Sequence, residues 1–372
     1  MKKYFVMAAL AVSTLTASAQ SVVPKWINNV KLSGFGIVQY TYNGQENNES
    51  NSFNLRLARL ALDGRAFDDW YWKAQIQFNG NTSTLGSSPK LVDLFIEWQK
   101  YDFLRVKAGQ FKNPFTYENP MHPIEQGFMS YSQVISKFAG FSDRAGAHSS
   151  NGRDIGVQLQ GDFLKNASGR NLIHYQVGVF NGQGINVKDV DQQKNIIGGA
   201  WVMPVEGMRL GAFGWIGSYA RKGTSASEGI TNTTLRRLQQ RRYAFSAEYK
   251  VDDWTFRSEY VHSTGYAFAK AMVNTNDASA KDITLSSNGD KSQGVYALVI
   301  APIIKKKCHA KARYDMYQPS KGAEKQRTQY EIGLDYYFNK NICLTGEYAY
   351  IHDRALADPN YSMIDVELSY RF

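Results

Sequence analysis

Basic side chains recur at alternate positions of apolar segments, an arrangement suited to holding anions. Seven candidates lie in or next to such segments: Lys73, Arg105, Lys107, Lys112, Arg257, Lys311 and Arg313. Arginine contacts phosphate or carboxylate through two parallel hydrogen bonds, whereas lysine presents a compact positive charge. Rings or ladders of these residues select anions where they line a pore. Acidic residues such as Asp93, Glu331 and Glu347 fall on the same faces, so each basic residue could instead form an ion pair that stiffens a wall.

Residues typical of catalysis are scattered along the chain. The six histidines form no His-Glu-x-x-His pair, and neither a nucleophile elbow nor a phosphate-binding loop occurs. Asp189 and Asp191 could contact a calcium ion, but two nearby aspartates are more often only solvated. We therefore expect no enzyme, no metal and no cofactor.

The candidate residues must be positioned by strands, because the chain shows sixteen segments in which apolar and polar residues alternate. These segments are 31–42, 53–63, 69–79, 91–99, 103–109, 153–162, 172–180, 195–203, 208–217, 241–250, 254–262, 294–301, 307–317, 327–337, 342–351 and 362–372. In the third segment Trp70, Trp72 and Ile76 fall on one face, and Lys73 and Gln75 fall on the other. The second segment is less regular, since Arg56 and Arg59 fall on opposite faces. Either a bulge or a position of Arg59 at the periplasmic end would explain it.

The strand pattern indicates a membrane barrel. No run of about 18 apolar residues follows residue 19, so a membrane could be crossed only by strands. Strands in hydrocarbon must close into a barrel, because each unpaired backbone group costs several kcal/mol there. Sixteen is an even number, and long connections alternate with short ones, as in bacterial outer-membrane barrels. The long connections are 43–52, 80–90, 110–152, 181–194, 218–240, 263–293, 318–326 and 352–361. The sequence predicts an all-β fold, a transmembrane antiparallel 16-stranded β-barrel.

Both ends of the chain suit export to an outer membrane. Lys2 and Lys3 precede an apolar stretch and small residues up to Ala19, which predicts a signal peptide over 1–19 and a barrel domain over 20–372. The last segment alternates up to an aromatic residue, Phe372. We expect the outer membrane of a Gram-negative bacterium. A basic exported chain suggests anionic ligands or surfaces and no nucleic acid. The cluster Arg236, Arg237, Arg241 and Arg242 could bind lipopolysaccharide phosphates or attract anions.

The longest connection, 110–152, is a candidate constriction of the pore. A connection of this length in a compact protein is usually functional or disordered, and this one is rich in aromatic residues. It should therefore fold against another part of the protein. We expect the third extracellular loop to fold into the barrel.

Five stretches resemble the phosphate-selective porin O and P family. They are 106–115 with Glu118, then 152–158, 177–182, 312–315 and 332–337. The resemblance implies an outer-membrane homotrimer of sixteen-stranded barrels, each with an inward-folded third loop and a basic channel that favours small anions such as phosphate. It also implies contact with outer-membrane lipid and with the barrel-assembly machinery. General diffusion without phosphate specificity is the alternative, and a surface-binding barrel or an outer-membrane hydrolase is a more distant one.

Overall fold

The computed structural model describes residues 24, 26–79, 89–145, 150–225, 230–267, 279–280 and 291–372. Its wall strands, in chain order, are β1 (Ile27–Asn43), β2 (Ser50–Ala66), β3 (Trp70–Gln77), β4 (Lys90–Tyr101), β5 (Leu104–Lys112), β6 (Arg153–Lys165), β7 (Asn171–Phe180), β8 (Asn195–Val202), β9 (Met208–Ser225), β10 (Ile230–Val251), β11 (Trp254–Thr264), β13 (Lys291–Ile304), β14 (Cys308–Gln318), β15 (Arg327–Asn339), β16 (Ile342–Asp353) and β17 (Asn360–Arg371). Each predicted segment overlaps one of these strands. The predicted signal peptide lies outside the described residues.

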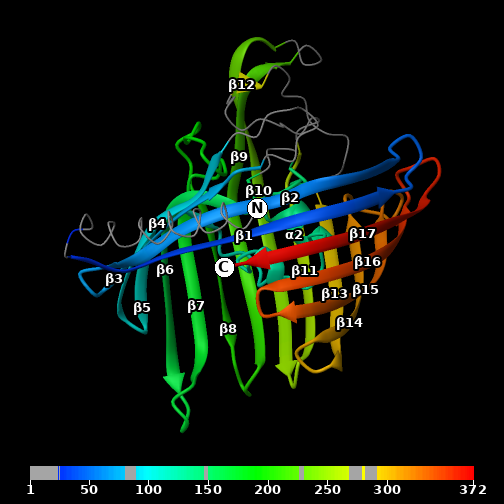
Figure 1. Cartoon of the computed structure of the whole chain (residues 1–372). Helices are drawn as coiled ribbons and strands as arrows, with labels where there is room; N and C mark the ends of the chain where they lie inside the picture. The colour runs from blue at the N-terminus through cyan, green and yellow to red at the C-terminus, as the bar shows by residue number, and fades with distance from the viewer. Residues whose placement is uncertain are drawn as a thin grey trace, which may run out of the picture.

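The sixteen strands form a closed antiparallel barrel (Figure 1). Each strand pairs with the next wall strand, and β1 closes the sheet by pairing with β17 from Phe35↔Arg371 to Asn43↔Met363. A further short strand, β12 (Ser279–Ala280), pairs parallel with β9. The predicted fold class and the predicted number of wall strands are therefore confirmed.

Helices occur in the connection between β5 and β6. They are the 3-10 helix η1 (Pro123–Glu125) and the helix α2 (Gln133–Phe138). Within the described ranges, no helix has the length and apolar character needed to span a membrane.

The two faces of the wall have opposite polarity. Apolar residues point outward and stay exposed, with Leu94 53% and Ile332 60% accessible. Their polar neighbours along the strands, such as Gln75 and Glu331, are buried inside. This pattern suits a barrel with lipid outside and a polar interior, and it agrees with the faces predicted for the third segment.

The strands β9 and β10 are longer than predicted. The segment 218–240, expected to be a loop, is largely a hairpin in which Gln240 pairs with Gly217 and Thr234 pairs with Gly223. The hairpin continues beyond the rim of the barrel (Figure 1). Backbone pairing needs no apolar face once a strand has left the hydrocarbon, so the alternation used for prediction ends before the strand does.

A β-bulge in β2 resolves the irregular arginines. Ile37 pairs with Leu57 while Val38 pairs with Leu55, so Arg56 is an extra residue opposite Ile37. The bulge lets Arg56 and Arg59 both face the interior, where both side chains are largely buried. Arg56 donates to Glu367 of β17 at 2.7 Å.

Deleting Arg56 should be tolerated by the barrel. Without the extra residue, Leu57 still lies opposite Ile37 and Leu55 opposite Val38, so Phe53 and Leu55 keep their outward faces. Deleting Leu60, in the regular part of β2, should instead lower the folded fraction after refolding into detergent micelles by roughly half or more, because a one-residue slip reverses the faces of neighbouring residues such as Arg59. Equal folding of both deletion variants would contradict the role of the bulge.

Candidate functional site

The connection between β5 and β6 packs against the inner wall. Phe115, Phe128 and Phe138 from the connection share one buried cluster with Phe213 and Tyr296 from the wall. Helix α2 contacts β11, β13 and β14. These contacts fix the path of the connection along inward-facing side chains.

Carboxylates of the wall accept hydrogen bonds from the backbone of this connection. Glu259 of β11 accepts from the N–H groups of Tyr117 and Glu118 at 2.8 and 2.9 Å. Asp315 accepts from the N–H group of Gln133 at 2.8 Å. Glu347 accepts similarly from Met129 at 3.0 Å. Buried donors left without partners are costly, so these acids hold the connection in place.

Three of the predicted selectivity residues hold the same connection through its carbonyl groups. Arg257 lies on β11, and Lys311 and Arg313 lie on β14. Their hydrogen bonds run to the carbonyl oxygens of Gln126 at 2.8 Å, Gly127 at 2.7 Å and Ser130 at 3.0 Å, respectively. These side chains therefore have a structural task, whatever passes through the pore.

The charges of these three residues are also compensated by acids. Each is less than a tenth exposed and forms an ion pair with a neighbouring strand. The pairs are Arg257 with Glu248 at 2.7 Å, Lys311 with Asp335 and Glu347 at 2.7 Å each, and Arg313 with Glu331 at 2.5 Å. Arg105, a fourth candidate, pairs with Asp162, which also contacts Nδ1 of His174 at 2.7 Å. Paired charges of this kind contribute little net field to a passing ion.

The other three candidates meet in one cavity of about 260 Å³, here called the basic pocket. Its cationic lining consists of Arg59, Lys73, Lys107, Lys112 and Arg153. A single carboxylate, Asp93, lines it as well. Strands β2 to β6 supply these side chains. The pocket lies between this part of the wall and the connection between β5 and β6, here called the inner connection.

Four of the five cations in the basic pocket form no ion pair with its carboxylate, Asp93. Asp93 is occupied by Arg153, which contacts both of its oxygens at 2.7 and 3.1 Å. Lys107 lies 3.6 Å from Glu97, just outside the lining. Lys112 donates to the Met121 carbonyl at 2.6 Å, and Arg59 donates to the Gln77 side chain at 3.0 Å. Among the described residues, Lys73 forms no ion pair.

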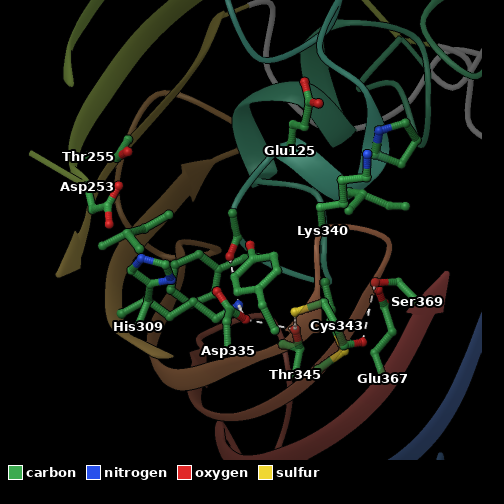
Figure 2. A pocket seen from close by; sticks show the side chains of 18 of the residues that line it. Glu125, Asp253, Thr255, His309, Asp335, Lys340, Cys343, Thr345, Glu367 and Ser369 are labelled. Carbon is green, nitrogen blue, oxygen red and sulfur yellow. Dashed lines mark hydrogen bonds and ion pairs between the residues drawn. The ribbon is translucent and has the colours of Figure 1, made fainter. Parts of the chain in front are cut away.

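Two other cavities of the barrel interior lack this excess. One of them, here called the vestibule, has a volume of about 520 Å³ and lies at the short-turn end, the end of the barrel at which the connections between strands are short. It is lined by five cationic and five carboxylate side chains. Figure 2 shows Asp335, Thr345 and Glu367 among its lining residues. The outer cavity, about 180 Å³, has two cations and three carboxylates: Lys137, Arg327, Glu331, Glu347 and Asp365. Of these three cavities, the basic pocket alone has more cationic than carboxylate side chains in its lining.

Sequence reasoning missed two cations of the basic pocket. Arg59 was obscured by the bulge at Arg56. Arg153 pairs across the strands with Lys112, at the point where the chain leaves the wall and returns to it. Both residues of this pair lie in stretches that carried the family resemblance. Pairing those two stretches as neighbouring strands would have predicted that Lys112 and Arg153 lie side by side.

His122 borders the basic pocket and is neutral at pH 7. Burial, together with the positive charges of Lys112, Arg59 and Lys73, lowers the pKa of His122 to about 4. Its Nδ1 accepts a hydrogen bond from the N–H group of Ile124 at 3.3 Å, which an unprotonated nitrogen can do. The imidazole thus adds no charge to the pocket at neutral pH.

Comparison with known proteins supports the barrel and the family resemblance. The model of the family described as "Phosphate-selective porin O and P" matches residues 33–191, which confirms the resemblance inferred from the motifs. No curated protein matches the chain. The family match and the fold point to a channel rather than an enzyme, and to the outer membrane of a Gram-negative bacterium.

Several solved structures share the fold at low sequence identity. The anion-selective porin from Comamonas acidovorans is 13% identical, with a TM-score of 0.60 over 92% of this chain and 99% of that one. The outer membrane channel DcaP of Acinetobacter baumannii is also 13% identical, with a TM-score of 0.60 over 92% and 97%. A loop L8 deletion mutant of OmpT from Vibrio cholerae is 11% identical, with a TM-score of 0.62 over 92% and 99%.

Replacing Glu259 with alanine should loosen the inner connection. The substitution leaves the N–H groups of Tyr117 and Glu118 and the Tyr296 hydroxyl without their acceptor. We expect the free energy of unfolding, measured with urea in micelles, to fall by roughly 3 kcal/mol. Single-channel conductance should rise as the connection moves. Glu206→Ala, in an exposed turn, is the control; a Glu259→Ala barrel as stable as that control would contradict the anchoring role.

Acid should destabilise the protein through His122. The unfolded chain binds a proton near pH 6.5, whereas the folded protein binds it only near pH 4, so this contribution to stability is complete above pH 6.5 and is lost as the pH falls toward 4. Between pH 7.5 and 4.5, the free energy of unfolding should fall by about 2 kcal/mol more in the unmodified protein than in His122→Asn. His352→Asn, at the long-loop end, should behave like the unmodified protein. The same pH dependence in His122→Asn would refute the assignment.

Proposed function

We propose that the chain forms a passive channel for small anions across the outer membrane. The observation that carries this proposal is the basic pocket, in which five cations face one carboxylate. Charges beside low-dielectric walls focus the field and raise the local concentration of the opposite ion. An attraction of about 1.4 kcal/mol is enough for a tenfold increase. The family match and the barrel fold support the channel itself.

The inner connection would narrow the channel and bring anions close to the basic pocket. A sixteen-stranded barrel is too wide for its own side chains to fill, so selectivity needs a constriction. Contacts with Glu259, Asp315 and Glu347 support this role for residues 110–152. Lys73, Lys107 and Lys112 are the predicted selectivity residues on which the proposal rests. Arg105, Arg257, Lys311 and Arg313 would contribute less, because carboxylates contact their charged groups at 2.7 Å or less, whereas Lys107 lies 3.6 Å from Glu97 and Lys73 forms no ion pair among the described residues.

The partners of the chain follow from the same proposal. The barrel would assemble as a homotrimer in outer-membrane lipid with help from the barrel-assembly machinery, as the family resemblance implies. Arg241 lies exposed on β10, where it could contact lipopolysaccharide phosphates. Arg242 is unsuited to that task, since it pairs with Asp143 inside the barrel at 2.7 Å. General diffusion without ion preference is the alternative function.

Reversing charges in the basic pocket should abolish the preference for anions. Lys73→Glu combined with Lys107→Glu removes the excess of cations over carboxylates in the lining. In planar bilayers under a KCl gradient, the unmodified protein should give a reversal potential of the anion-selective sign. The double variant should lower the anion-to-cation permeability ratio by about threefold or more.

Lys165→Glu serves as the control for this experiment, because its side chain is 56% exposed at the short-turn end, outside the pocket. It should keep the permeability ratio of the unmodified protein. Cation preference in the unmodified protein, or equal effects of the control and the double variant, would refute the proposal.

A further inference from the structure

The basic pocket has an apolar half. Its lining includes Phe35, Phe95, Phe111, Pro120, Met121 and Pro123 besides the charged residues. Phe35 and Phe111 come from wall strands β1 and β5, and Phe95 comes from β4, while the prolines and Met121 come from the inner connection. Apolar and cationic surfaces therefore enclose the same space from both the wall and the connection.

Cations and aromatic rings are interleaved in this lining. The Nζ atom of Lys107 lies 5.0 Å from the ring centre of Phe95 and 5.3 Å from that of Phe111. The guanidinium carbon of Arg59 lies 5.8 Å from the ring centre of Phe35. Phe95 and Phe111 pack edge to face with centres 5.9 Å apart. An anion that reaches these cations must also contact apolar side chains.

Such a lining discriminates among anions by the polarity of the group to which the charged atoms are attached. Inorganic phosphate is polar on every side. Contact with the phenyl rings would remove water from its oxygen atoms without supplying hydrogen bonds in return. A carboxylate attached to an apolar ring can bury that ring against the phenyl groups while its oxygens face the lysines. The volume of about 260 Å³ is below the roughly 300 to 1,000 Å³ of sites for drug-sized ligands. It suits a molecule with a single ring.

We propose that the basic pocket is a binding site for small organic carboxylates that carry one apolar ring, and that these ligands bind there more tightly than inorganic phosphate. This inference rests on the proposed anion channel and names its substrate class. Lys73 and Lys107 supply the charge, and Phe35, Phe95 and Phe111 supply the apolar surface. The vestibule lies next to the pocket, since Pro123 lines both cavities.

Block of the chloride current in planar bilayers tests the inference on the purified full-length protein. Benzoate, acetate and phosphate are added separately at pH 7, with a KCl reversal potential recorded on the same membranes. Benzoate and acetate carry the same charge, so their comparison isolates the ring. We expect half-block by benzoate at a concentration about tenfold lower than by acetate or phosphate.

Substitutions in the pocket locate the effect. Phe95→Ala should reduce the tenfold advantage of benzoate over acetate to about threefold or less, because the ring loses a contact surface. Phe35→Leu should also reduce this advantage. It is an independent test, because it leaves Lys107 and the neighbouring rings of Phe95 and Phe111 unchanged. Phe163→Ala is the matched control, since that ring lies exposed at the short-turn end of β6, and it should keep the advantage.

The outcomes separate this inference from the proposed function. Equal block by benzoate and acetate, with the anion-selective reversal potential retained, would overturn the inference and leave the anion channel standing. Stronger block by phosphate than by benzoate would overturn it in favour of a phosphate site. An advantage of benzoate that survives both Phe95→Ala and Phe35→Leu would also overturn it. Absence of anion preference in the unmodified protein would overturn the proposed function itself.

Discussion

The need to pair every backbone N–H and C=O group within hydrocarbon governs the rest of this structure. A sheet that crosses a membrane can satisfy that need only by closing, and the pairing of β1 with β17 completes the closure. Closure of sixteen strands creates an interior that polar side chains must line. The charges of that interior lie beside low-dielectric walls, where an uncompensated charge has a strong effect. The function proposed for the chain therefore depends on which interior charges are paired.

The interior divides its charges between two tasks. On β11 and β14, arginines and a lysine are matched by acids, and together they bind the backbone of the inner connection. Arg313 is an example, because it contacts Glu331 and the Ser130 carbonyl simultaneously. Across the barrel, Lys107 of the basic pocket lies 3.6 Å from Glu97, and among the described residues Lys73 forms no ion pair. The paired side holds the connection between β5 and β6, and in the proposed channel the surplus side acts on ions.

Much of the fold was predictable from the sequence, because alternation reports directly on the boundary between lipid and the interior. All sixteen strands and the faces of Lys73 and Gln75 follow from it. Alternation carries no information where a bulge adds a residue, as at Arg56, or where a strand leaves the membrane, as in the hairpin of β9 and β10. It also cannot show that Lys311 and Arg313 are paired while Lys73 is not. Pairing depends on strand register and on the path of a distant connection.

The pairing of β1 with β17 has a consequence for the stage between synthesis and membrane insertion. Until the last strand is synthesised and exported, β1 has no partner on one edge, and the sheet cannot be sealed. Contacts between the two ends of a chain form slowly, because closing such a long loop is entropically costly. During that delay the apolar strands and open edges are prone to aggregation. Cellular quality control therefore has to protect the entire polypeptide before insertion, and loss of the final strand removes the whole barrel rather than one sixteenth of it.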